Sequence, residues 1–392
     1  MTVRMKIVIR VWVLTLILAI DAYGRNQVVA DSVSHSPLSY ASVFNKNGKL
    51  IGQCERNGEI PYFTLSEYPL TIRCMGYCEQ IVHRNNSDTI FMQEKVTALP
   101  EIIVESRNRK ILHMLAYVRE YSTLTSFTDT IFMFREKTVD FMMPQDIQST
   151  KGWRKPRVLA SKSYFQFTDT HGTDSVSDAC DYHFSWSDWI GILPSIDIPT
   201  KLSNKNIGSD TIYGKYSPTE IWIRGNDKLK IDIDVLADNM SRKWVPSLSS
   251  FFNDDIDFDM FKMHFNYDDN GSETIMPVDL SGYSFIIEST GRGHDMFMFN
   301  NNSPSYFVRT YAEVYIVDKS FIKASELKKW ERRKLSAGNI GAFMTDVPEL
   351  SPEIVALIDR VNHIDKNAVR LNFQPDHRLG SFREKETLGQ SI

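Results

Sequence analysis

The sequence predicts a mainly β protein with two β-rich units, helices connecting them and further helices at the carboxyl end. Short apolar runs rich in β-branched and aromatic residues recur along the chain, and turn signals separate them. Aromatic residues make up 12% of the composition, which suits sheet faces better than helix bundles. A chain of 392 residues is also long enough for two or three domains, each with its own core.

Residues 1–24 have the pattern of a secretory signal peptide. Three basic residues precede the apolar run 11–20, which is about half of the ~20 residues that a membrane-spanning helix needs. Ala22 and Gly24 then place small side chains at the −3 and −1 positions of a cleavage site. An uncleaved amino-terminal anchor is the alternative. We expect removal of this segment and an exported protein, periplasmic or associated with the outer membrane, with no later transmembrane segment.

The charge of the chain limits its partners. The formal net charge is −4, and removal of residues 1–24 leaves −6. The sequence has no basic block of the kind that nucleic acid binding rewards. We therefore expect no nucleic-acid partner, and anionic membrane surfaces are disfavoured for the same reason. No cofactor is expected, and no set of residues has the spacing of a metal site.

Residues 25–105 read as a series of short strands. The expected strands are 27–30, 40–44, 50–54, 61–65, 70–74 and 89–92. Asn45–Gly48 and Asn57-Gly58 lie between strands and tolerate the positive φ of tight turns. Six or seven strands at this spacing predict a sandwich of two small sheets.

The same span contains a series of short motifs in a fixed order. They are Asp31-Ser32, Pro37-Leu38, Tyr40–Val43, Gly48, Gly52, Asn57-Gly58, Leu70, Ile72 and Gly76-Tyr77, followed by Leu99–Val104. This pattern resembles the carboxypeptidase-regulatory-like domain, and its end is similar to the L-x-E-V-x-V close of that domain in proteins of the Bacteroidetes. Cys54-Glu55 and Ile60 depart from the family pattern.

The resemblance implies a transthyretin-like β-sandwich over 25–105 and nothing beyond it. Domains of this family are non-catalytic accessory modules and often precede the plug of TonB-dependent outer-membrane receptors. The resemblance therefore implies an architecture and a compartment without supplying active residues. A zinc carboxypeptidase would need His-x-x-Glu, and no histidine in this sequence has Glu three residues later.

Residues 106–125 are expected to form a helical connector. Ile111, Leu115 and Val118 recur at helical spacing, which predicts an amphipathic helix packed on the next domain.

Residues 126–321 turn strongly β again. The clearest expected strands are 163–167, 228–235, 261–267, 284–287 and 311–317. They predict a second, larger β-rich region of the sandwich type. The sequence leaves open whether this region is one domain or two. Residues 322–392 then predict carboxyl-terminal helices and a polar tail. One helix is expected over 325–334, and Ser351 as N-cap with Pro352 at the first helical position begins another.

The four cysteines are Cys54, Cys74, Cys78 and Cys180. In an oxidising compartment they permit disulfides, and four cysteines allow three pairings. Free buried thiols are an equal alternative. The sequence leaves the pairing open.

Two stretches are candidates for a functional site. Trp186 and Trp189 lie three residues apart, so an extended strand would send them to opposite faces and leave one to stack on a sugar ring. Packing of both in the core through a turn is the more ordinary interpretation. Arg292, His294 and Asp295 follow a strand and alternate with glycine, and together they could recognise an anion or exchange a proton. An ordinary polar turn explains the same residues.

These patterns favour an exported, non-enzymatic binding or assembly protein of the cell envelope, whose partner is a cell-envelope glycan or an outer-membrane protein. A hydrolase with a site near His294 is the alternative from another class, and glycan binding through Trp186 or Trp189 is a second alternative.

Overall fold

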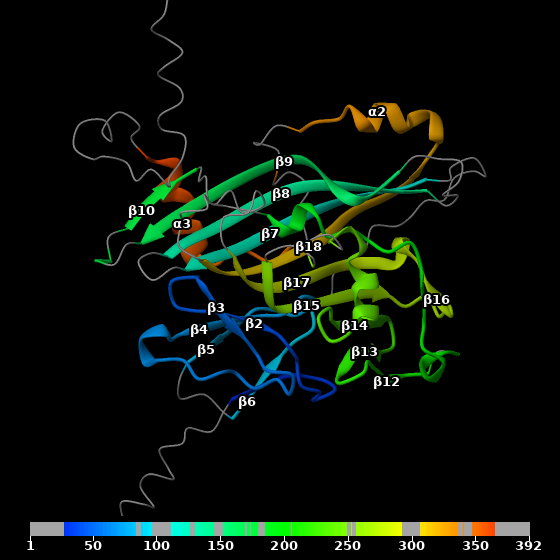
Figure 1. The fold of residues 1–392 in the computed structure, drawn as a ribbon, viewed down its shortest axis with the longest axis horizontal. Coiled ribbons are helices and arrows are strands. Elements are labelled where there is room, and N and C mark those ends of the chain that lie inside the picture. The colour runs from blue at the N-terminus through cyan, green and yellow to red at the C-terminus, as the bar shows by residue number, and fades with distance from the viewer. Residues whose placement is uncertain are drawn as a thin grey trace, which may run out of the picture.

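The protein is mainly β, as the sequence predicts, with large sheets and few helices (Figure 1). The computed structural model describes residues 27–83, 88–95, 111–125, 130–144, 152–168, 171–172, 174–178, 185–204, 206–248, 252, 256–291, 306–335, 340 and 347–364. The expected leader, the segment 99–104, Cys180 and the polar tail from 365 lie outside these residues. Within the described part of the chain, no helix is long and apolar enough to cross a membrane.

The amino-terminal unit has two small sheets. In one, β1 (Val28–Asp31) and β6 (Thr89–Met92) pair in parallel. The other has the order β3-β2-β4-β5, with bounds Leu50–Gln53, Ser42–Phe44, Leu70–Arg73 and Gln80–Val82. A compact apolar cluster that includes Val29, Val43 and Ile72 packs between them. The expected strand 61–65 does not form, while β5 forms without having been predicted.

Among the described residues after the amino-terminal unit, ten strands form one antiparallel sheet, in the order β10-β9-β8-β7-β18-β17-β15-β14-β13-β12. The bounds are β7 Ile111–Thr125, β8 Thr130–Pro144, β9 Trp153–Thr168, β10 Asp174–Ser177, β12 Gly208–Tyr213, β13 Pro218–Arg224, β14 Lys228–Asp234, β15 Ile256–Asp268, β17 Leu280–Gly291 and β18 Tyr306–Ile322. A small pair, β11 (Ile196–Asp197) and β16 (Thr274–Ile275), lies beside it. The last long strand, β18, pairs with the first, β7, so residues far apart in sequence are neighbours in the middle of the sheet.

The predicted helical connector is wrong, because residues 111–125 are the central strand β7. Twelve consecutive residues from Ile111 to Ser122 are buried, since both faces of this strand are covered. Burial on both faces removes the alternation of apolar and polar residues that marks a half-exposed strand, and the spacing of Ile111, Leu115 and Val118 then imitates a helix. The expected boundary at residue 126 therefore falls inside a continuous sheet.

One face of the sheet carries the largest apolar cluster. It gathers alternate residues of the long strands, such as Met114 and Val118 on β7 and Val139 on β8. Two crossing segments fill this face: the connection after β10 contributes Trp186, and the connection after β14 contributes Trp244.

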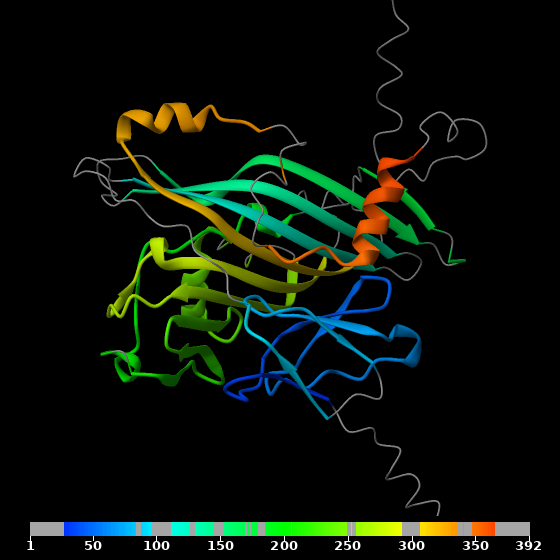
Figure 2. The same cartoon turned by 180° about the vertical axis from the view of Figure 1, so that it is seen from behind.

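The other face is covered by the amino-terminal unit and by the helix α3 (Pro352–Asn362), which Figure 2 shows against β9 and β10. Phe44, Tyr121, Tyr311 and Leu357 belong to one apolar cluster at this junction. The predicted helix start at Ser351 and Pro352 is confirmed. The other expected helix, 325–334, is shorter, with a 3₁₀ turn at Ala324–Glu326 and α2 at Leu327–Glu331.

Candidate functional site

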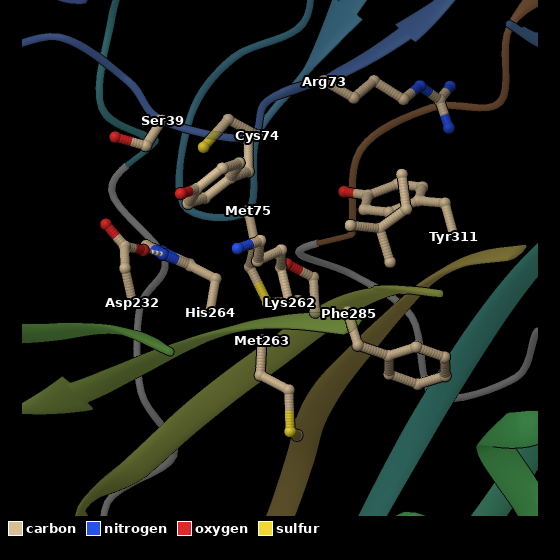
Figure 3. Close-up of a pocket in the computed structure, with 13 residues that line it drawn as sticks. Ser39, Arg73, Cys74, Met75, Asp232, Lys262, Met263, His264, Phe285 and Tyr311 are labelled. Carbon is tan, nitrogen blue, oxygen red and sulfur yellow. Dashed lines mark hydrogen bonds and ion pairs between the residues drawn. The ribbon is translucent and has the colours of Figure 1, made fainter. Parts of the chain in front are cut away.

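A small pocket lies where the amino-terminal unit meets β14, β15 and β17 (Figure 3). Ser39, Tyr40, Arg73, Cys74 and Met75 line it from the amino-terminal unit; Asp232, Lys262, Met263, His264, Ser284, Phe285, Ile286 and Tyr311 line it from the sheet. Its cavity volume is about 20 Å³. A volume of that size holds about one water molecule and no organic substrate.

The sheet side of the pocket is a ladder of cross-strand charged pairs. Lys228, Lys230, Asp232 and Asp234 alternate along β14, opposite Asp268, Asn266, His264 and Lys262 of β15, and we call these eight residues the polar ladder. Alternate residues of a strand share one face, so directly opposite positions of the two strands meet. Lys228 and Asp268 are 2.5 Å apart, and the pairs His264–Asp232 and Lys262–Asp234 are also in contact.

The amino-terminal unit docks on the polar ladder through two loops. Lys230 Nζ donates to Tyr77 Oη at 2.7 Å and also contacts Glu94, while Lys262 Nζ lies 4.8 Å from the centroid of the Tyr40 ring. Gly76 has φ of +85°, and a Cβ there would lie 3.1 Å from the Asn266 side chain. The positive φ favours glycine here, and any larger residue would also have to displace the Asn266 side chain slightly.

Cys74, His264 and Asp232 line one pocket, yet their environment opposes thiol catalysis. Burial, with a smaller contribution from Asp232, raises the pKa of the Cys74 thiol to about 12. Only the thiolate is a good nucleophile, so Cys74 is held in its unreactive form at neutral pH. His264 Nδ1 contacts the Asp232 carboxylate, and His264 Nε2 lies 3.2 Å from Asn266 Oδ1. His264 therefore links neighbouring side chains of β14 and β15.

The sequence-predicted tryptophans pack in the core. Residues Trp186–Asp188 form a 3₁₀ turn, and the Trp186 side chain is 0% exposed, with its ring centroid 5.4 Å from that of Phe258. Trp189 is half-buried, and Lys155 Nζ lies 4.7 Å from its ring centroid. Trp186 thus offers no face to a sugar. Arg292, His294 and Asp295 lie outside the described residues, beyond Gly291 at the end of β17.

The three described cysteines, Cys54, Cys74 and Cys78, are free. Cys54 and Cys74 follow β3 and β4, which both pair with β2 and so lie on either side of it. Two strand spacings separate their backbones by roughly 9–10 Å, beyond the ~7 Å that a disulfide can span. A search of the described residues finds no cluster of three or more His, Cys, Asp or Glu side chains suited to a metal.

Sequence reasoning missed a buried charged cluster in the large core. Glu120, Lys137, Ser185, Ser187 and Asp188 contact one another there, and we call them the Lys137 cluster. Burial alone would raise the pKa of Glu120, but Lys137, Arg135 and the two serine hydroxyls outweigh burial and lower it. The signal in the sequence is Lys137 at an inward position of β8, where Met133, Val139 and Phe141 are apolar.

Several large apolar side chains along the edge hairpin of the sheet are exposed. Ile207, Ile212, Tyr213, Tyr216 and Met240 lie on or beside the β12–β13 hairpin and are 67%, 36%, 71%, 83% and 76% exposed; we call them the edge patch. Large exposed aromatic and aliphatic side chains that gather in one place mark interaction surfaces.

Hydrogen bonds to Asp238 order the backbone at the tip of the β12–β13 hairpin. The Asp238 carboxylate accepts from the backbone N–H of Met240 at 3.0 Å and of Lys215 at 3.1 Å, which ties the hairpin tip to the following 3₁₀ segment. These two backbone hydrogen bonds lower the pKa of Asp238. Beneath the hairpin, the Glu220 carboxylate accepts from the indole N–H groups of Trp222 and Trp244, at 2.9 and 3.0 Å.

Comparison with known proteins places the chain in no family. No family model matches it, and no curated protein matches it. Among solved structures, it has a likeness to lipovitellin, from a structure titled "Lipid-protein interactions in lipovitellin", at a TM-score of 0.27 and 8% identity. That match covers 56% of this chain and 26% of the lipovitellin chain. A likeness this weak provides neither a fold family nor a function.

Proposed function

We propose that this protein is an exported, non-enzymatic binding protein of the cell envelope that pairs its edge strand β12 with an extended segment of an outer-membrane protein. The observation that carries the proposal is the edge patch on a free strand. β12 pairs with β13 on one side and has no strand on its other side within the described residues.

A free edge strand offers unpaired backbone groups to an incoming strand, and exposed side chains along it give selectivity. In β12, residues Gly208, Ser209, Ile212 and Tyr213 are exposed. The register irregularity between Ile212 and Tyr213 limits pairing to a short stretch, which opposes indiscriminate aggregation.

The residues around the edge patch favour an acidic partner segment. Lys201 is 68% exposed and Lys215 lies at the hairpin tip; Lys243 is 55% exposed and contacts Glu220. Asp210 contacts Lys201 at 3.8 Å, and Asp238 is engaged with backbone N–H groups. Lysines at the rim speed association with a negatively charged partner and add selectivity. Because Asp238 orders the backbone at Lys215 and Met240, less backbone ordering opposes binding there.

The test is fractionation of the full-length protein in its native envelope. We expect the wild-type protein to sediment with the outer membrane and the triple variant Tyr213→Ala, Tyr216→Ala, Met240→Ser to shift to the soluble fraction. A photo-crosslinking residue at position 213 should yield a discrete protein adduct in the wild-type background. Tyr62→Ala is the matched control, because Tyr62 is 86% exposed but lies in the amino-terminal unit; it should sediment as the wild type does.

Two results would overturn the proposal. In one, wild type and triple variant fractionate alike, which would remove the edge patch from partner binding. In the other, the purified wild-type protein binds protein-free phosphatidylethanolamine vesicles and the triple variant does not, which would make a lipid surface the partner.

A further inference from the structure

The Lys137 cluster joins two neighbouring strands to a crossing segment of the core. Glu120 lies on β7 and Lys137 on β8, which pair directly (Figure 1). Ser185, Ser187 and Asp188 come from the 3₁₀ turn after β10 and its preceding residue. The Lys137 side chain is 1% exposed and Glu120 0%, so both lie inside the large apolar core.

Lysine and aspartate are in direct contact in this cluster. Lys137 Nζ lies 2.5 Å from Asp188 Oδ1, 2.8 Å from Ser187 Oγ and 3.3 Å from Glu120 Oε2, and it also contacts Ser185 Oγ. The two serine hydroxyls donate to Glu120 Oε2 as well, at 2.5 and 2.7 Å. Each serine therefore bridges the lysine nitrogen to the glutamate.

The Lys137 cluster and the neighbouring Arg135 together carry two positive and two negative charges. Lys137 and Arg135 oppose Glu120 and Asp188, and Arg135 lowers the pKa of Glu120 together with Lys137. Burying an ammonium group and a carboxylate carries a large desolvation penalty. Joining Lys137 to Asp188 through an amide would remove one charge of each sign and leave Arg135 matched by Glu120.

We propose that Lys137 and Asp188 condense to form an intramolecular amide bond, with Glu120 as the proton-transfer residue. The modification would link β8 covalently to the segment that fills the core face of the sheet. It requires no oxidant or cofactor, because the ammonium and the carboxylate together contain all the atoms of the amide and one water molecule.

The reaction balances as follows within the cluster. The Glu120 carboxylate accepts a proton from the Lys137 ammonium through a bridging serine hydroxyl and passes it to the Asp188 carboxylate. The neutral Nζ attacks Asp188 Cγ, forming the N–C bond. Nζ then gives up a second proton by the same route to the departing oxygen, the C–O bond breaks, and water leaves. Glu120 ends as a carboxylate, as it began.

The positions of the two partners suit this reaction. Lys137 is enclosed by protein and lies in direct contact with the Asp188 carboxylate, so the two reacting groups are already side by side. The Asp188 side chain is 36% exposed. The water that is released therefore has a path to solvent on the Asp188 side.

The test is the intact mass of the purified full-length protein, measured after denaturation and complete reduction of the cysteines. We expect the wild-type mass to be lower than the sequence mass by one water molecule. Tryptic digestion should leave Lys137 uncut and give a branched peptide that joins Lys137 to Asp188.

Matched variants distinguish the amide bond from any other modification that lowers the mass by one water molecule. Lys137→Arg keeps the charge but cannot form the amide, so it should show the full mass. Glu120→Gln cannot accept the proton and should also show the full mass, while Asp188→Asn should form the same amide with loss of ammonia in place of water. A full mass for the wild-type protein overturns the proposal, as does a loss of water that persists in Lys137→Arg.

Discussion

The buried carboxylate of Glu220 provides a direct test of how the edge of the sheet is held. It is 3% exposed and accepts one indole N–H on each oxygen, from Trp222 and Trp244, whose side chains are 1% and 0% exposed. Lys243 Nζ lies 2.7 Å from the same carboxylate but is 55% exposed. Glu220 therefore ties β13 to the 3₁₀ segment that carries Met240.

Replacing Glu220 with glutamine keeps the shape and removes one acceptor. One indole N–H then faces an amide N–H₂ group, and a buried donor without an acceptor costs roughly 1–3 kcal/mol. Loss of the exposed Lys243 pair adds less than about 1 kcal/mol. We expect Glu220→Gln to lower the free energy of unfolding by about 2–3 kcal/mol. Glu220→Leu leaves both indole N–H groups without an acceptor, and it should lower the free energy of unfolding by about twice as much.

Urea unfolding followed by tryptophan fluorescence measures this change, with near-ultraviolet circular dichroism reporting on the two rings. Lys243→Met is the control and should change the unfolding free energy by less than about 1 kcal/mol. A Glu220→Gln variant within about 0.5 kcal/mol of wild type would refute the reasoning, because surface substitutions without structural effect fall in that range.

Three further predictions concern other parts of the fold. Burial lowers the pKa of Lys319 to about 8 from 10.5, so the unfolded state binds more protons between these pH values and stability should rise with pH across that window. The rise, about 2 kcal/mol between pH 7 and about 9.5, should be missing in Lys319→Met when urea unfolding of both proteins is compared over that range. Gly76→Val places a side chain against Asn266 in a strained backbone conformation. It should lower the free energy of docking of the amino-terminal unit by at least about 1 kcal/mol and speed amide hydrogen exchange at Tyr77 and Lys230. Unchanged exchange at these two residues would contradict the docking role. In native protein, Cys78 should react with a thiol reagent and Cys54 and Cys74 should not, because Cys78 is exposed and burial raises the pKa of the other two thiols; rapid modification of Cys74 before unfolding would contradict this.

Local sequence patterns were sufficient where one face of an element meets water. β14 alternates Leu229, Ile231 and Ile233 with charged residues, so its period of two predicts a strand. α3 was also predictable from the sequence, because Ser351 and Pro352 mark its start. Ile354, Leu357 and Val361 form its apolar face. Turn residues such as Gly48, at φ +69°, marked the hairpins of the amino-terminal unit.

The candidate site was far less predictable. The tryptophans that stood out are packed in the core, while the residues that contact one another are spread along the chain. The Lys137 cluster joins positions 120, 137 and 185–188, and the pocket of Figure 3 joins Cys74 to Asp232 and His264. No spacing rule covers such distances, since strand pairing and docking alone bring these segments together.

By itself, therefore, the sequence determined the β character of the chain, most of its strands and its last helix, because each depends on neighbours a few residues away. Only the tertiary structure decided that residues 111–125 are a strand, that ten strands of the larger β-rich unit join in one sheet, and which charges meet in the core. The physical reason is that a segment covered on both faces loses its periodic signal, and its conformation is then set by partners hundreds of residues away in sequence.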